Sequence, residues 1–149
     1  MDVTGTTAVD RLDGVLAWNV LRAARSVGNR LAERLTGHGL NPVQFGVLAF
    51  LADRTAMTTA EIAREVLLRP QSVAPLLDQL EERGLARRSG TREKGRRNPI
   101  EITDAGRAAL DGAWATAAEA GDLSDLGITE QESRQLNALL LRIIAGTSG

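Results

Sequence analysis

The sequence predicts a mainly α-helical protein with one small β-hairpin, an α+β arrangement in a single domain. Three observations lead to this prediction. Apolar residues recur at helical spacing near both ends of the chain, and a series of helix-capping signals lies between them. The third observation is a strongly basic stretch, Arg83–Arg97, which carries seven cations and one anion in a chain of 149 residues with a net charge of −1.

Composition limits the classes of protein to which this chain can belong. Its 43% apolar and 25% charged residues are typical of a globular domain. No apolar run approaches the roughly 20 residues that span a bilayer, and the N-terminus lacks the features of a secretory signal, so we expect a cytoplasmic protein. With no cysteine and one histidine, the chain offers no thiolate metal site and no set of base, orienting group and nucleophile. We therefore expect no enzyme, no metal and no cofactor.

Apolar residues at helical spacing predict a long amphipathic helix over residues 11–36, which ends before Gly39. Asn41 and Pro42 then favour a second helix over residues 42–53, because asparagine caps a helix and proline suits its first position. This second helix is expected to bury Val43, Phe45, Leu48 and Leu51, or neighbours of these residues.

The centre of the chain carries the signals of two consecutive helices. Thr58 and Glu61 match a capping box, which predicts a short helix over residues 59–66. Pro70 opens the next helix, and Gly84 stands in the usual position after a helix C-terminus. The residues of this second helix that we expect to pack inward are Val73, Leu76, Leu77 and Leu80.

Two short strands follow, over residues 85–90 and 99–102, with the basic loop between them. Thr103 is a capping candidate for a long helix over residues 104–119, and Thr129 begins another capping box ahead of a last amphipathic helix. A short helix, a tight turn, a second helix and then a basic hairpin form the arrangement of a winged helix-turn-helix.

The outward face of the helix that begins at Pro70 suits the recognition of duplex DNA. Glutamine bonds adenine bidentately, serine bonds several base edges, and alanine or proline contacts the thymine methyl group. The exposed amides at the helix N-terminus also favour a nearby phosphate. The residues that we predict to read bases are Gln71, Ser72, Ala74 and Pro75. Because Pro75 removes a backbone hydrogen bond, it either bends the first turn or stands where distortion is tolerated.

The basic stretch is also consistent with a solvated surface or a disordered loop. The hairpin signals on both sides favour contact with a polyanion instead. Its cations need not act together, since Arg83 lies near a helix C-terminus, where it complements the helix dipole. Arg87 and Arg88 are adjacent on a strand and point to opposite faces, so only one of them can face DNA.

Five short segments match a known family in order and spacing: Gly39–Leu48, Thr59–Ala63, Arg69–Val73, Leu80–Leu85 and Ile102–Gly106. Together they resemble the MarR (multiple antibiotic resistance regulator) family of winged-helix transcription factors, over about residues 12–145. The resemblance implies a homodimer in which the first, fifth and sixth helices interlock and two winged lobes read successive major grooves. The whole chain, 1–149, is then one domain, with the DNA-binding lobe at 40–103 and dimerisation helices at 10–37 and 104–146.

The resemblance also implies that the hairpin, or wing, reaches a flanking minor groove through the arginine of an Asp-x-Arg motif. This arginine corresponds to Arg96, but Lys94 stands where the family has the aspartate that helps to hold the wing. Glu93 offers a substitute carboxylate, or Lys94 adds a phosphate contact. The contacts expected outside the bases are Thr59 and Arg69 to phosphate, and Arg96 with Arg92 or Arg97 in the minor groove.

Members of this family commonly bind small anionic aromatic molecules between the dimerisation helices and the winged lobes. The candidates here are Trp18, Arg22, Arg25 and His38, with Trp114 as a further one, because tryptophan stacks and arginine pairs with a carboxylate. The same residues are also explained as core or dimer-interface tryptophans, solvated arginines, and a capping or surface histidine.

The sequence therefore predicts a homodimeric, ligand-responsive repressor that binds a palindromic operator in duplex DNA. The alternative is a winged-helix protein-interaction module that docks on an acidic partner and has no specific operator. We expect no membrane binding, because the polar faces of the terminal helices are not strongly basic. Residues 108–149 are in fact acidic, with two cations and six anions.

Overall fold

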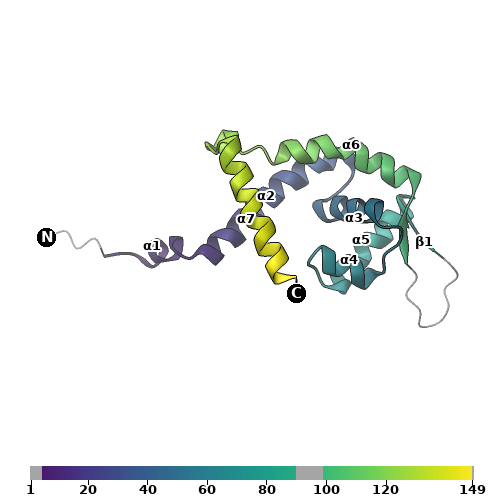
Figure 1. Cartoon of the computed structure of the whole chain (residues 1–149), viewed down its shortest axis with the longest axis horizontal. Helices are drawn as coiled ribbons and strands as arrows, with labels where there is room; N and C mark the ends of the chain where they lie inside the picture. The colour runs from purple at the N-terminus through teal and green to yellow at the C-terminus, as the bar shows by residue number, and fades with distance from the viewer. Residues whose placement is uncertain (1–4, 90–98, 149) are drawn as a thin grey trace.

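The computed structural model describes residues 5–89 and 99–148, which form a mainly helical chain with one two-stranded sheet, as predicted. In chain order the elements are α1 (Ala8–Asp13), α2 (Leu16–Leu35), the 3-10 turn η1 (Thr36–His38), α3 (Pro42–Asp53), α4 (Thr59–Glu65), α5 (Pro70–Glu82), β1 (Ala86–Arg88), β2 (Ile100–Ile102), α6 (Asp104–Ala120), the 3-10 turn η2 (Ser124–Leu126) and α7 (Glu130–Thr147). Figure 1 shows α3, α4, α5 and the hairpin gathered in one lobe beneath α6, with α1 and α7 to one side of that lobe. None of the described helices is both long and apolar enough to cross a membrane.

The long amphipathic helix predicted over residues 11–36 is confirmed as α2 from Leu16 to Leu35, but its start is wrong, because the chain breaks between α1 and α2. Gly14 closes α1, and its N–H donates to the carbonyl oxygens of Arg11 and Leu12. The side-chain amide of Asn19 then donates to the Asp13 carbonyl oxygen over 2.8 Å and holds the corner. The apolar spacing continues through this corner, so periodicity alone did not reveal it.

Local capping signals place the helices of the lobe as predicted. Asn41 forms a complete capping box with Gln44 at the start of α3. The Thr58 hydroxyl accepts from the Glu61 N–H at the start of α4. Gly84, with φ of +71°, ends α5 in the left-handed conformation that glycine adopts without strain. The predicted ranges for α3, α4 and α5 are confirmed to within about two residues, the usual uncertainty of a helix end.

The hydrophobic core lies where α3, α4, α5 and the hairpin meet α2 and α6. Leu48 and Leu51 are fully buried, as expected, but Val43 and Phe45 are only half-buried. Val47 and Gln44 are buried in their place. The reason is that α3 packs against α2, α5, α6 and β2 together, so no single apolar stripe faces the core. The buried amide of Gln44 is satisfied by hydrogen bonds to Asn41 and Gln79.

The predicted hairpin is confirmed, with β1 antiparallel to β2 and Arg87 opposite Glu101. Met57 adds a short bridge to Ile100 on the other edge of β2. At the base of the wing, the Ser89 N–H donates to the Pro99 carbonyl oxygen over 2.9 Å. β2 is therefore bonded to β1 on one edge and to Met57 of the lobe on the other.

Helices α2 and α7 present apolar side chains to solvent in the single chain. None of the described residues of α7 is buried, although its apolar residues recur on one side of the helix. The exposed apolar residues of α7 are Leu136, Leu139, Leu140, Leu141, Ile143 and Ile144. On α2, Leu16, Val20, Leu21 and Val27 are also exposed. This much exposed apolar surface on α2 and α7 marks an interaction site.

An ion pair fastens α2 to the turn between α6 and α7. Arg30 Nη2 lies 2.8 Å from Asp125 Oδ1 and also donates to the Asp122 carbonyl oxygen. The hydrogen bond from Arg30 lowers the pKa of Asp125 below its ordinary value of 3.8. A carboxylate whose pKa is lower in the folded state adds stability above its unfolded pKa and loses it as the pH falls through the folded value.

We therefore expect the stability of the protein to fall below about pH 4, partly because Asp125 becomes protonated. Asp125→Asn should be less stable than wild type at pH 7, and this difference should vanish at low pH. Thermal unfolding between pH 7 and pH 2.5 measures it, with Asp111→Asn on α6 as the control. A difference that stays constant across this range would contradict the role of the Arg30–Asp125 pair.

Candidate nucleic-acid interface

A tight turn between α4 and α5 sets the angle of the second helix. Leu67 occupies the left-handed region with φ of +57°, a conformation that costs a non-glycine residue about 1–2 kcal/mol. The Leu68 N–H donates to the Ala63 carbonyl oxygen over 3.0 Å and closes the end of α4. Pro70 then begins α5 at once. The result is a helix-turn-helix whose turn is held by backbone bonds and by burial of Ala63.

One face of α5 is anchored in the core and the other is open. Val73, Leu77 and Leu80 are buried, as predicted, whereas Leu76 is half-buried. On the opposite side the predicted base-reading residues lie within the first two turns. Of these, Gln71, Ser72 and Pro75 are exposed and Ala74 is half-buried.

The expected phosphate contacts lie beside this face. Arg69 is exposed and directly precedes α5 as its N-cap, without a capping hydrogen bond from its side chain. Thr59 is half-buried at the first position of α4. The helix-turn-helix thus gathers the N-terminal part of α5 and the residue before it into one surface.

Pro75 lies inside α5 without interrupting it, since the helix runs unbroken from Pro70 to Glu82. Its ring removes the N–H that would ordinarily bond the Gln71 carbonyl oxygen one turn earlier. The side chain of Pro75 is exposed, so the ring stands on the open face of the helix. The distortion is therefore tolerated within the first turns of α5.

The described cations of the basic stretch make contacts inside the protein. Arg83 donates to the Gly39 carbonyl oxygen, so it links the end of α5 to the start of the lobe as well as standing at a helix terminus. Arg87 is 69% exposed and lies 3.4 Å from Glu101 on the paired strand. Arg88 is 23% exposed and bonds both Asp78 and Glu81. The charge of Arg83–Arg97 therefore overstates its contribution to a DNA-binding surface.

The remaining charged residues of the wing, Arg92, Glu93, Lys94, Arg96 and Arg97, lie outside the described residues. Their predicted contacts with the minor groove remain predictions. The same holds for the consequence of Lys94 at the position of the family aspartate.

The sequence did not reveal the contact of Arg88 with two carboxylates of α5. The signal was present, because Asp78 and Glu81 are three residues apart and so share one face of the helix. Periodicity places this face toward solvent, and strand alternation gives no reason to pair Arg88 with it. Which of two adjacent strand arginines turns toward α5 depends on how the hairpin packs, and the local sequence does not state this.

The ligand candidates do not form one site within a single chain. Trp18, Arg22 and Arg25 lie in the first half of α2, with both arginines exposed. The indole N–H of Trp18 is buried and makes no hydrogen bond to any described residue. His38 follows the C-terminal end of this helix. That end lies about 25 Å from Trp18 along the helix axis, at a rise of 1.5 Å per residue. There its Nε2 lies 2.8 Å from the Thr116 hydroxyl oxygen of α6.

Two hollows lie where the lobe meets α6. One, of about 470 Å³, is formed by α3 and α6 beside Trp114, whose ring is 55% exposed and packs 5.3 Å from the Phe45 ring. Its lining residues are Ala49, Ala52, Asp53, Leu110, Asp111 and Trp114. The other, of about 270 Å³, lies between the end of α3, β2 and α6. Neither is lined by Trp18, Arg22, Arg25 or His38.

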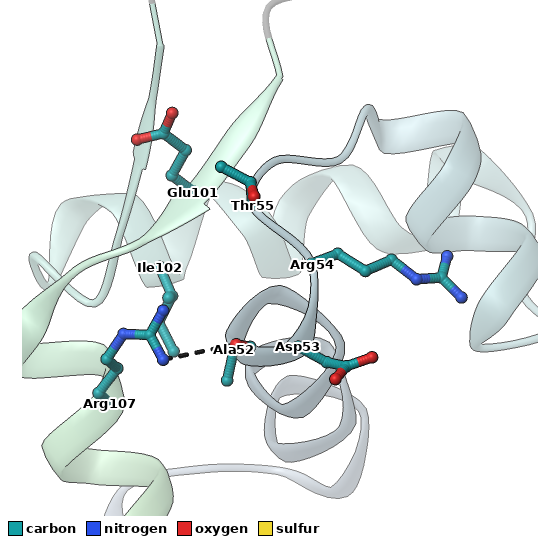
Figure 2. Close-up of a pocket in the computed structure, with 7 residues that line it drawn as sticks. All are labelled: Ala52, Asp53, Arg54, Thr55, Glu101, Ile102 and Arg107. Carbon is teal, nitrogen blue, oxygen red and sulfur yellow. Dashed lines mark hydrogen bonds between the residues drawn. The ribbon is translucent and has the colours of Figure 1, made fainter.

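The smaller hollow is lined mainly by polar and charged side chains. Figure 2 shows Arg107 extending toward the end of α3, where its Nη1 donates to the Ala52 carbonyl oxygen over 3.5 Å. Arg54 points to the other side and pairs with Glu65 at 2.9 Å. The contact across this hollow is therefore a hydrogen bond that links α6 to the end of α3. Within residues 5–89 and 99–148 no group of three or more histidine, aspartate or glutamate side chains could hold a metal ion.

Comparison with known proteins places the chain among transcriptional regulators. The sequence profile of the MarR family matches residues 38–97. The transcriptional repressor Rv2887 of Mycobacterium tuberculosis is 28% identical over 133 residues, which cover 88% of this chain and 94% of the relative. Its solved structure with salicylic acid matches with a TM-score of 0.69 and 25% identity, over 87% of this chain and 96% of that one.

Two further solved structures match over nearly their whole length. CouR from Rhodococcus jostii RHA1, solved with p-coumaroyl-CoA, has a TM-score of 0.76 at 26% identity, over 91% of this chain and 96% of that one. The transcriptional regulator PA3341 has a TM-score of 0.69 at 31% identity, over 89% of this chain and 97% of that one. With a lobe in which α4, a tight turn and α5 precede a hairpin, this chain belongs to the MarR family of winged helix-turn-helix transcriptional regulators.

Proposed function

We propose that the protein is a homodimeric repressor that binds a palindromic operator in duplex DNA through α5 and releases it when a small ligand binds. The observation that carries this proposal is that one side of α5 is buried and the other is exposed. Val73, Leu77 and Leu80 lock one side into the core, while Gln71 and Ser72 are exposed at its N-terminal end. A helix held in this way can enter a major groove without unfolding its lobe. Binding to the cell's DNA, rather than catalysis, also implies a cytoplasmic protein.

The proposal assigns the three parts of the chain different tasks. Residues 40–103 form the DNA-binding lobe of the single domain 1–149, and residues 10–37 and 104–146 form the dimer. The exposed apolar residues of α2 and α7 support this division, because they need a partner surface. A two-fold dimer would present two copies of α5 to two half-sites, which explains why a palindrome is expected.

Base and phosphate contacts follow from the position of each residue around α5. Gln71, Ser72, Ala74 and Pro75 face the bases. Thr59 and Arg69 face phosphates at the two helix N-termini of the motif. From the family resemblance, Arg96 with Arg92 or Arg97 enters the minor groove beside the half-site.

Gln71→Ala should weaken binding to the preferred operator by about 1–3 kcal/mol, because a bidentate contact to one base is lost. It should also relax the sequence preference at one position of each half-site. Affinity measured on the operator and on single-position variants tests both effects. The control is Gln135→Ala on α7, which removes the same group far from the lobe. Equal weakening on every duplex would move Gln71 from base reading to backbone contact.

The ligand of the proposed repressor is a small anionic aromatic molecule. Rv2887 was solved with salicylic acid and CouR with p-coumaroyl-CoA, both of which carry an aromatic ring and negative charge. Trp18, Arg22 and Arg25 on α2 offer an indole and two guanidinium groups within about two turns. His38 lies at the other end of α2, beside α6, and would belong to a second contact region nearer Trp114.

Selection of bound duplexes from a random pool is the decisive experiment for DNA binding. A palindromic half-site pair about one helical turn apart would support both the operator and the dimer. Release of the selected duplex on adding salicylate would support the ligand class. Retention of all duplexes alike, with strong binding to an acidic protein partner, would favour the protein-interaction module instead.

A further inference from the structure

The hairpin is joined to α5 by one arginine that bridges two carboxylates. Arg88 Nε lies 3.0 Å from Glu81 Oε2, and Arg88 Nη2 lies 3.1 Å from Asp78 Oδ1. The two acids occupy consecutive turns of α5 on one face, so a single guanidinium reaches both. Arg88 is the last residue of β1, and the Ser89–Pro99 bond follows immediately. The bridge therefore stands at the base of the wing.

The neighbouring arginine shows that this arrangement is specific to Arg88. Arg87 is 69% exposed and touches one carboxylate, Glu101, at 3.4 Å across the same hairpin. Arg88 is 23% exposed and holds two separate acceptors with different nitrogen atoms. Exposed single pairs contribute little to stability, but a planar guanidinium that joins two acceptors fixes a geometry. Arg88 joins two elements, whereas Arg87 joins two strands of one hairpin.

The two acids are otherwise unfavourable on a helix that approaches DNA. Asp78 and Glu81 stand on α5 beyond the predicted base-reading residues, and each would repel a phosphate backbone. With Arg88 between them the three side chains carry a net charge of −1 instead of −2. Carboxylates on this helix would weaken contact with DNA. Their bonds to Arg88 give them a different role, which is to hold the hairpin.

We propose that Arg88 is a positioning residue, which with Asp78 and Glu81 sets the angle between the wing and α5. This inference rests on the proposed DNA-binding function, since the angle decides whether α5 and the wing can reach adjacent grooves together. It also supplies a hold on the wing that does not depend on the family aspartate, whose place Lys94 takes. Arg88 then acts through the position of the wing and makes no contact with DNA.

The first test needs no DNA. In Arg88→Met, which keeps the aliphatic stem, the Ser89 amide that bonds Pro99 should exchange its hydrogen at least 10-fold faster, as measured by NMR. The double variant Asp78→Asn/Glu81→Gln leaves Arg88 in place and should show the same acceleration. Arg87→Met is the matched control and should change this exchange less than 3-fold. Unchanged exchange in both bridge variants would overturn the proposal.

The second test uses the operator selected as described above. Arg88→Met should lose protection of the flanking minor grooves in a hydroxyl-radical footprint, while protection of the central major grooves persists. Asp78→Asn/Glu81→Gln should lose the same flanking protection although it is two charges less negative. Adding Arg88→Met to this double variant should then cost no further affinity.

The opposite results separate the competing explanations. If Arg88 contacts a phosphate, Arg88→Met should weaken binding equally in the wild-type and double-variant backgrounds, and the proposal fails. If Asp78 and Glu81 act only by repulsion, their removal should tighten binding and leave the flanking footprint intact, which also overturns it. A wild-type protein with no specific footprint would contradict the DNA-binding proposal instead, and the exchange experiment would still decide whether Arg88 holds the wing.

Discussion

Gly106→Ala should lower the free energy of unfolding by about 3 kcal/mol, the upper part of the range for overpacking a well-packed site. A methyl group on Gly106 would stand 2.0 Å from the Leu85 carbonyl oxygen and 2.7 Å from Cγ1 of Ile102. The first of these neighbours is backbone and cannot turn aside. The Gly106 N–H is also held by the Thr103 hydroxyl over 3.1 Å, so the start of α6 cannot shift freely. Urea unfolding at a fixed protein concentration measures the loss.

Gly112 provides the control for this prediction on the same helix. Apart from its chain neighbours and the backbone of its own helix, no atom lies within 4 Å of the position that its methyl group would take. Gly112→Ala should therefore raise stability by about 0.5–1 kcal/mol, because alanine is the better helix former. If both variants unfold at the wild-type urea concentration, the close packing of α6 against the hairpin is not what stabilises the lobe.

The double variant Leu140→Asp/Ile144→Asp should convert the proposed dimer to a monomer. These residues lie one turn apart on the exposed apolar side of α7, at 37% and 45% exposure. Each buried side chain of this size contributes about 1.5–3 kcal/mol, and a carboxylate in its place would lie unpaired in the interface. Operator affinity should fall at least about 100-fold, because each lobe would bind its half-site alone.

Sedimentation velocity and operator titration measure these two effects separately. Ala138→Asp adds the same charge on the opposite side of α7 and serves as the control, since it should leave both the dimer and the affinity intact. A double variant that stays dimeric would place the interface elsewhere. One that becomes monomeric yet binds the operator at wild-type affinity would contradict the two-lobe mode of recognition.

Much of the fold could be predicted from the sequence because its signals are local. Asn41, Thr58, Thr103 and Thr129 each cap a helix through a bond to a residue three positions ahead. Pro70 and Gly84 bound α5 through their own backbone preferences. The hairpin was predicted from two short segments, residues 85–90 and 99–102, on either side of the basic stretch. A capping residue and its partner lie within one turn, so a linear reading finds both.

The errors in the prediction lie where the local pattern is ambiguous. Apolar spacing continues from α1 into α2, and the corner at Gly14 is held by Asn19 from the next helix. Around α3, apolar residues occur on every side, so the pattern did not show that Gln44 and Val47 would be buried before Val43 and Phe45. In each case the missing information was which neighbouring element packs against the helix.

In the candidate site, too, some features follow from local sequence and others depend on how the elements pack. The helix that presents Gln71 and Ser72 can be predicted from the chain alone, because the apolar residues of α5 dictate which side turns inward. The packing of the elements, in contrast, is needed to see that Arg88 bridges Asp78 and Glu81 and that Arg30 pairs with Asp125. It also separates His38, which contacts α6, from Trp18. Capping and periodicity act between residues a few positions apart, whereas ion pairs between elements depend on how whole helices and strands pack.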